Sequence, residues 1–197
     1  SPNGGMESMI QRVVRQIRES KLTDNITFAT NAVQCDSIIN QLGEDVSVVI
    51  EPERRDTFPA IALASSYLSK EKQCSNDEVV VVMPCDVYTE SIYFVTIGKM
   101  VETVEKNVAD LVLMGITPTY PSEKFGYVMS KNDDLMDGIA TVERFVEKPN
   151  VEKAKELLAQ GACWNGGVFA FRLGYITSIL NKYVSAPSFA EVRSRYQ

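Results

Sequence analysis

The sequence contains no histidine, which excludes several kinds of catalytic and metal-binding site at once. Without imidazole, no Ser–His or Cys–His pair can activate a nucleophile, and no histidine can bind zinc. Any chemistry must therefore use carboxylates, lysine, arginine and backbone donors. This set of groups suits metal-assisted phosphoryl or nucleotidyl transfer, in which positioning and neutralisation of charge do most of the catalysis.

Paired cysteines, excess positive charge and long apolar runs are also missing. The four cysteines form no CxxC pair, so we expect reduced thiols rather than a disulfide framework or a zinc site. A net charge of -6 argues against a surface that binds nucleic acid or anionic membrane. No apolar run reaches the roughly 18 residues that a membrane span needs, and no leader pattern is visible. We therefore expect a soluble, cytoplasmic protein with no nucleic acid and no membrane as partner.

Hydrophobic residues make up 45% of the 197 residues, enough for one sizeable core. In most of the chain, short apolar runs alternate with helical patterns of about 10–15 residues. This alternation predicts βαβ units and therefore an α/β, Rossmann-like fold with a mixed, mostly parallel sheet flanked by helices. We expect strands at 26–30, 46–50, 78–83, 110–116 and 168–172, a hairpin of 127–130 with 139–146, and helices at 6–17, 35–42, 57–68, 95–104 and 151–160.

Two charged segments follow predicted strands, at the edge where open α/β sheets bind ligands. Asp86 comes just after the strand at 78–83, and a carboxylate there can hold Mg²⁺ against phosphate oxygens. Residues 51–60 join another strand to a helix N-terminus, whose free N–H groups favour an anion or a polar base edge. Each segment also has a simpler interpretation. Asp86 could cap a turn or helix, and residues 51–60 could be a solvated charged loop.

Two further segments lie next to strands in the second part of the chain. Glu147 and Lys148 would point to opposite faces if the strand continued, so that one could meet a hydroxyl and the other a phosphate. The alternative is an ion pair on the surface. Residues 164–167 precede the last predicted strand; their glycines permit close approach of a ligand, and Asn165 can donate to and accept from hydroxyls. The alternative there is a glycine turn with a structural tryptophan.

Taken in order, these segments resemble nucleotide-diphosphate-sugar pyrophosphorylases, most closely the mannose-1-phosphate guanylyltransferases. The family patterns E-P-x-x-R-N-T-x-P-A, M-P-x-D, P-T-x-P…G-Y, F-V-E-K-P and W-N-x-G are similar to residues 51–60, 83–86, 118–127, 145–149 and 164–167. The resemblance implies the nucleotide-diphospho-sugar transferase fold, with residues 1–197 as a single nucleotidyltransferase domain. It also implies transfer of GMP from GTP to mannose 1-phosphate with Mg²⁺, and it leaves a homodimer open.

The same resemblance implies roles for individual residues. Asp86 would be catalytic and bind the metal, and Lys148 would be catalytic by neutralising the sugar 1-phosphate. The residues that would line the nucleotide are Glu51, Arg54, Thr57, Pro59 and Pro84. The residues that would bind the sugar are Gly126, Tyr127, Glu147 and Asn165.

The chain departs from the family pattern in three places. Asp56 replaces the usual Asn, and residues 122–125 replace the commoner E-T-G-Y. The opening strand with its phosphate loop, and a second metal-binding aspartate beyond residues 164–167, have no counterpart. We therefore expect a domain that is incomplete at both ends, part of a longer polypeptide, with little turnover by these 197 residues alone. A pyrophosphorylase for another sugar and base, or a non-catalytic sugar-phosphate-binding module, is the alternative.

Overall fold

The computed structural model of the protein describes residues 6–44, 46–131 and 138–196. The chain forms two compact units, the first from Ser1–Val112 with Ala170–Gln197 and the second from Leu113–Phe169. Each unit has a buried apolar cluster of its own. The α/β class with a mixed arrangement of strands is confirmed, although the strands lie in two sheets rather than one.

The first unit follows the predicted alternation of helices and strands. Its elements are α1 (Met9–Glu19), β1 (Thr27–Asn31), α2 (Ala32–Leu42), β2 (Ser47–Glu51), α3 (Thr57–Lys70), β3 (Val79–Val82), α4 (Ser91–Glu105), α6 (Leu173–Tyr183) and α7 (Phe189–Ser194). β1 and β2 pair in parallel, with Thr27 opposite Ser47, and α2 makes the connection between them. This is a βαβ unit, as the alternation predicts.

The second unit contains the antiparallel part of the fold. Its elements are β5 (Tyr127–Ser130), β6 (Val142–Val146) and α5 (Val151–Ala159), while β4 (Leu111–Ile116) and β7 (Cys163–Arg172) have residues in both units. β5 pairs antiparallel with β6 and with β7. The strand order is β3-β7-β5-β6, and β4 pairs with β7. The acidic turn predicted inside 132–138 lies largely outside the described residues.

α1 begins at Met9 rather than at residue 6. Ser8 is the N-cap: its hydroxyl accepts a hydrogen bond from the Gln11 backbone N–H at 3.3 Å, and its own N–H donates to Gln11 Oε1 at 3.1 Å. This reciprocal capping satisfies two backbone N–H groups that the helix cannot satisfy itself. The S-x-x-Q pattern that marks such a start is present in the sequence.

β7 begins at Cys163 and not at residue 168. Cys163 and Trp164 pair with Val128 and Tyr127 of β5, so the strand includes these residues and the glycines that follow them. Gly166 lies so close to β4 that an added Cβ would be 3.0 Å from the Met114 carbonyl oxygen. Gly166 therefore serves close strand packing, whereas Gly167 has a left-handed backbone with φ of 69°, a conformation that favours glycine.

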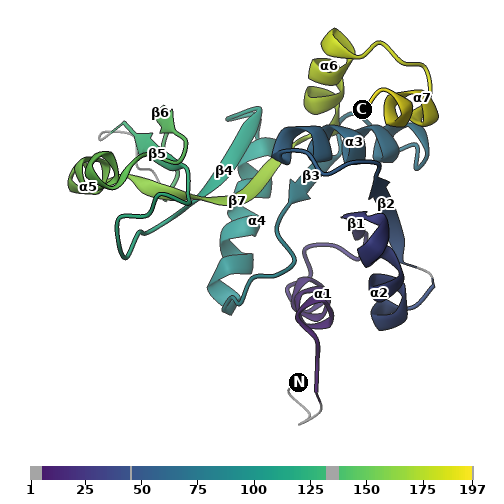
Figure 1. Ribbon diagram of the computed structural model, residues 1–197, viewed down its shortest axis with the longest axis horizontal. Helices are drawn as coiled ribbons and strands as arrows, with labels where there is room; N and C mark the ends of the chain where they lie inside the picture. The colour runs from purple at the N-terminus through teal and green to yellow at the C-terminus, as the bar shows by residue number, and fades with distance from the viewer. Residues whose placement is uncertain (1–5, 45, 132–137, 197) are drawn as a thin grey trace. The chain divides into compact units, whose positions relative to one another are not determined.

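The C-terminal helices cover α3 within the first unit. α3 contacts both α6 and α7, as Figure 1 shows. A buried cluster joins these helices to β2. Its members are Val49, Ala62, Leu63, Leu180, Ala186, Val192 and Tyr196. α6 and α7 are two helices beyond those predicted, and both have buried apolar residues.

All four cysteines are free thiols, as predicted. Within the described ranges, no helix combines the length and apolar character needed to cross a membrane.

Candidate functional site

Four of the five predicted nucleotide residues, Glu51, Arg54, Thr57 and Pro59, lie at the turn from β2 into α3. β2 ends at Glu51, and α3 begins with Thr57, so that Pro59 lies in its first turn. Asp56 is the N-cap residue by its backbone angles, but its carboxylate makes no capping hydrogen bond. The first N–H groups of α3 consequently have no cap, and the helix dipole favours an anion or a polar acceptor there.

Glu51 is linked to the C-terminal segment of the same unit. Its Oε2 accepts a hydrogen bond from the Tyr196 hydroxyl at 3.2 Å. Burial, and then the nearby carboxylate of Glu51, raise the pKa of Tyr196 to about 12. Tyr196 thus remains a neutral donor at physiological pH and holds Glu51 at the end of β2.

The two arginines of this loop differ in their surroundings. The Arg55 guanidinium lies 3.3 Å from Glu53 Oε2 and 6.0 Å from the centre of the Tyr196 ring. Arg54 is exposed and makes no side-chain hydrogen bond or ion pair with the described residues. Of the two, Arg54 is the cation that a phosphate or a base could recruit without breaking an existing contact.

Asp86 lies in the loop that joins β3 to α4. Pro84 is half-buried, whereas Cys85 and Asp86 are exposed. Burial of its sulfur, and then the charge of Asp86, raise the pKa of the Cys85 thiol, which argues against a thiolate nucleophile. Among the described residues, no three potential ligands gather around a common point. A single carboxylate fits a magnesium ion that keeps several waters and is shared with substrate phosphates, not one bound by protein alone.

The second unit brings together the predicted sugar residues. The Asn165 backbone N–H donates to the Gly126 carbonyl at 2.7 Å, which joins β7 to the residue before β5. The Glu147 carboxylate lies against Gly126, since a Cβ added at Gly126 would be 2.7 Å from Glu147 Oε2. Asn165 Oδ1 accepts from the Gly167 N–H at 3.1 Å, which turns the amide group of Asn165 in a fixed direction. The Glu147 carboxylate and the Asn165 backbone N–H thus both lie against the backbone of Gly126, and carboxylate and amide groups of this kind can bind sugar hydroxyls.

The strand does not continue through Glu147 and Lys148, so their side chains do not point to opposite faces, and the structure shows the alternative, an ion pair on the surface. β6 ends at Val146, and Lys148 has a left-handed backbone with φ of 42°. The alternation of side chains requires an extended strand, and this turn breaks it. Lys148 Nζ instead lies 3.3 Å from Glu147 Oε1, and both side chains are more than half exposed. A left-handed conformation is unfavourable for a residue with a Cβ, so this backbone is less stable with lysine than with glycine at residue 148.

Tyr127 has a supporting position. Its side chain is fully buried, and its hydroxyl donates to the Ser122 carbonyl at 3.0 Å and accepts from the Ser122 N–H at 2.8 Å. The hydroxyl therefore fixes the loop that leads to Gly126, and the side chain offers no exposed surface to a ligand.

An aromatic cluster beside these residues was not predicted as part of the site. Tyr120 and Phe125 have their ring centres 5.1 and 4.7 Å from that of Trp164. Both smaller rings are exposed in part, and the indole N–H of Trp164 is a buried donor with no acceptor in the described ranges. The sequence contains aromatic residues at 120, 125 and 164, but only the fold brings their side chains into contact.

The structure thus divides the predicted residues into groups. Within the second unit, Gly126 is in contact with both Glu147 and Asn165, and Glu147 forms an ion pair with Lys148. The nucleotide residues lie on two loops of the first unit, and within the described ranges no hydrogen bond or ion pair links these loops.

Comparison with known proteins agrees with the fold and shows the family. The family model for nucleotidyl transferases matches residues 2–188. The chain belongs to the nucleotidyl transferase family. Among curated relatives, it is 32% identical over 150 residues to the alginate biosynthesis protein AlgA of Pseudomonas fluorescens, covering 75% of the chain and 30% of the relative. It is 33% identical over 152 residues to the mannose-1-phosphate guanylyltransferase of Escherichia coli, covering 74% and 30%. The chain therefore spans about 30% of the length of these nucleotidyl transferase relatives.

Solved structures agree with the fold of this chain. A structure described as mannose-1-phosphate geranyltransferase from Thermus thermophilus has a TM-score of 0.76 and 24% identity, covering 96% of this chain and 58% of the other. A structure described as mannose-6-phosphate isomerase from Helicobacter pylori has a TM-score of 0.73 and 24% identity, covering 91% and 67%. At these identities, the likeness establishes the nucleotidyl transferase fold alone.

Proposed function

We propose that this protein carries part of the machinery that transfers GMP from GTP to mannose 1-phosphate, giving GDP-mannose and pyrophosphate. The observation that carries the proposal is the convergence of Gly126, Glu147 and Asn165 in the second unit. Family membership and the guanylyltransferase among the relatives support the reaction type and the choice of substrates.

The second unit is assigned to the sugar phosphate. Glu147 and Asn165 bind mannose hydroxyls, and the backbone of Gly126 lies against the sugar ring because no side chain separates them. The ammonium group of Lys148 moves from Glu147 to the phosphate. The existing ion pair is largely exposed and contributes little, so this exchange is easy. Tyr127 supports the loop that contains Gly126.

The first unit is assigned to the nucleotide. Glu51 and the open N-terminus of α3 at Thr57 and Pro59 accept the base, Arg54 supplies positive charge, and Pro84 lies beside the nucleotide. Asp86 shares Mg²⁺ with the phosphates of GTP. When bound, the metal reduces the charge repulsion between the two anionic substrates.

In the proposed reaction, a phosphate oxygen of mannose 1-phosphate attacks the α-phosphorus of GTP. A new P–O bond forms as the bond from the α-phosphorus to the leaving pyrophosphate breaks, without a covalent enzyme intermediate. The attacking phosphate is already ionised near neutral pH, so no general base is needed and the lack of histidine is no obstacle. The residues of this chain orient the substrates and neutralise their charge.

The proposal also covers the setting of the protein. GTP and mannose 1-phosphate are cytoplasmic substrates, so we place the protein in the cytoplasm. We also propose a homodimer as its oligomeric state. Residues 1–197 are assigned to one nucleotidyltransferase domain in which each unit takes one substrate.

The test is pyrophosphate release by the polypeptide that carries this chain, with GTP, mannose 1-phosphate and Mg²⁺. We expect Glu147→Gln to raise the KM for mannose 1-phosphate by about tenfold, since a charged hydrogen bond is worth about 1.5–3 kcal/mol. Asp86→Asn should lower kcat by about 100-fold, with Asp24→Asn as an exposed control. Equal turnover of glucose 1-phosphate with UTP or dTTP would contradict the choice of substrates, and binding without turnover would indicate a non-catalytic module.

A further inference from the structure

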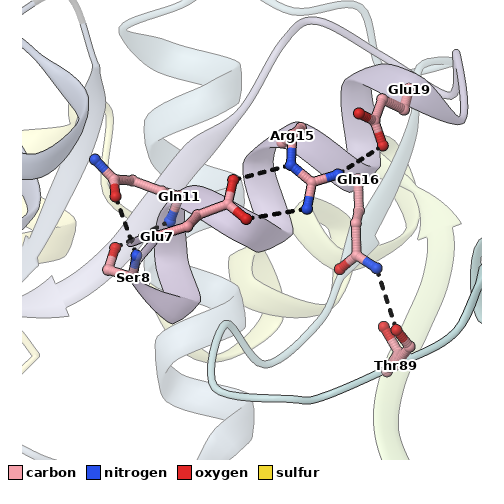
Figure 2. A network of polar contacts seen from close by, with 7 residues as sticks. All are labelled: Glu7, Ser8, Gln11, Arg15, Gln16, Glu19 and Thr89. Atoms are coloured by element: carbon pink, nitrogen blue, oxygen red, sulfur yellow. Dashed lines mark hydrogen bonds and ion pairs between the residues drawn. The ribbon is translucent and has the colours of Figure 1, made fainter. Parts of the chain in front are cut away.

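The loop that carries Asp86 is attached to α1 by three side-chain contacts. Arg12 Nη2 and Gln16 Nε2 both donate to the Thr89 carbonyl, at 3.3 and 3.1 Å. The Arg12 guanidinium also lies over the Tyr88 ring, 3.6 Å from its centre. Figure 2 shows Gln16 reaching from α1 to Thr89. The side chains of Arg12 and Gln16 therefore connect α1 to two consecutive loop residues, Tyr88 and Thr89.

Arg12 and Gln16 reach the same carbonyl because they are four residues apart on α1. This spacing places both side chains on one face of the helix. Val13 and Ile17, the residues that follow them, are buried and anchor α1 in the first unit. The contact therefore comes from a helix that the core already holds in place.

The loop has few other restraints. Among the described residues, the backbone groups of residues 84–89 make no hydrogen bond with other backbone groups outside regular helices and strands. Tyr88 is 82% exposed, so its ring contributes little to the core. Asp86 is three residues from Thr89, which places its Cα within about 10 Å of the braced carbonyl. The conformation of the loop near Asp86 therefore depends on the α1 contacts.

α1 itself is stiffened by polar contacts, seen in Figure 2. Arg15 donates to both carboxylate oxygens of Glu7, at 2.9 and 3.0 Å, and to Glu19 at 2.8 Å. Gln11 closes the capping box with Ser8 and donates to the Gln41 carbonyl of α2 at 2.9 Å. The helix is thus held at its first turn and tied to α2, as a support for a loop must be.

We propose that α1 is a brace for the Asp86 loop, with Arg12 and Gln16 as positioning residues that act through Tyr88 and Thr89. This inference rests on the proposed function, in which Asp86 shares a metal with the nucleotide. The brace restricts the loop to conformations in which the Asp86 carboxylate can reach that metal. Removal of the contacts between α1 and the loop lowers the fraction of molecules in which Asp86 can reach the metal. It leaves the sugar-binding residues of the second unit unchanged.

The experiment measures Mn²⁺ affinity in the presence of GTP, by electron paramagnetic resonance, on the polypeptide that carries this chain. Amide hydrogen exchange of residues 84–90 is followed on the same samples. Tyr88→Leu and Arg12→Met should each raise the Kd for Mn²⁺ by about three- to tenfold and speed exchange in the loop. Tyr88→Phe keeps the ring and should stay within about twofold of the parent protein. The same variants should lower kcat while the KM for mannose 1-phosphate stays constant.

Both Tyr88→Leu and Tyr88→Phe should fold normally, because the ring is exposed and neither change opens the core. A difference between these two variants therefore reports the loss of the ring contact and not unfolding. Parent-like Mn²⁺ affinity and loop exchange in both Tyr88→Leu and Arg12→Met would overturn the brace. If Asp86→Asn alone leaves Mn²⁺ affinity unchanged, the metal role of Asp86 fails. Exchange rates in the loop then decide separately whether α1 restrains it.

Discussion

Gly126 and Glu147 lie so close together that a side chain at residue 126 would require the side chains of Glu147 and Phe145 to move. A Cβ built on Gly126 would be 2.7 Å from Glu147 Oε2 and 2.5 Å from Phe145 Cζ. The carbonyl of Gly126 is in turn fixed by the Asn165 backbone N–H. The absence of a side chain at this residue therefore sets the distance between the carboxylate and the backbone that, by our proposal, holds the sugar.

We expect Gly126→Ala to displace both Phe145 and Glu147. Both displaced groups are the ends of half-exposed side chains, so the free energy of unfolding should change by only about 0.5 kcal/mol, whereas the KM for mannose 1-phosphate should rise by about tenfold or more. Steady-state kinetics and urea unfolding measure the two effects. Gly98→Ala is the control, since a Cβ there meets only Leu22 Cδ2 at 3.7 Å, an ordinary contact. It should be neutral or slightly stabilising because Gly98 lies inside α4. Parent-like kinetics for Gly126→Ala would contradict the close fit.

Two substitutions at Lys148 separate its charge from its backbone conformation. Lys148→Ala and Lys148→Gly both remove the ammonium group, so each should lower kcat/KM by at least tenfold. Only glycine adopts the φ of 42° without a steric penalty, so Lys148→Gly should be the more stable by about 1 kcal/mol. Chemical denaturation of the two variants measures this difference. Less than a tenfold loss of activity in either variant would remove Lys148 from its proposed role.

Tyr127→Phe tests the support of the loop before Gly126. The substitution removes the hydroxyl that satisfies the buried backbone N–H and C=O of Ser122. Leaving buried groups without partners costs about 1–3 kcal/mol, which should appear as a lower free energy of unfolding. Tyr183→Phe, at a tyrosine that is 81% exposed, should be neutral. Equal stability of the two variants would show that Ser122 does not depend on Tyr127.

Alkaline unfolding tests the bond between Tyr196 and Glu51. Burial and the adjacent carboxylate raise the pKa of Tyr196 from 10.0 to about 12, so the folded protein holds this proton more tightly than the unfolded chain. The contribution of Tyr196 is therefore complete below pH 10 and is lost as the pH rises toward 12. Tyr196→Phe should lose less stability than the parent across this range, by on the order of 1–2 kcal/mol. Denaturant midpoints at several pH values measure the difference, and parallel curves for the two proteins would contradict it.

Several elements could be predicted from the sequence because they depend on local patterns. The apolar spacing around Val13, Val14 and Ile17 predicts α1, and the parallel arrangement of β1 and β2 follows from the helix between them. The order of the segments that contain Glu51, Asp86 and Glu147 indicates the family before any contact is known. Local periodicity and short motifs survive folding because they reflect backbone geometry within a few residues.

Tertiary structure decided what these segments touch. Asn165 meets Gly126 only because β7 and β5 pair in one register, and a shift by one residue would turn the side chains to the other face. Glu51 and Tyr196 are 145 residues apart, and Gln16 and Thr89 are 73 apart. The left-handed turn at Lys148 also reverses the direction that strand alternation predicts. The sequence by itself thus determined which residues are available for the chemistry. The fold decided their neighbours, because strand register and helix packing bring together residues that no local pattern connects.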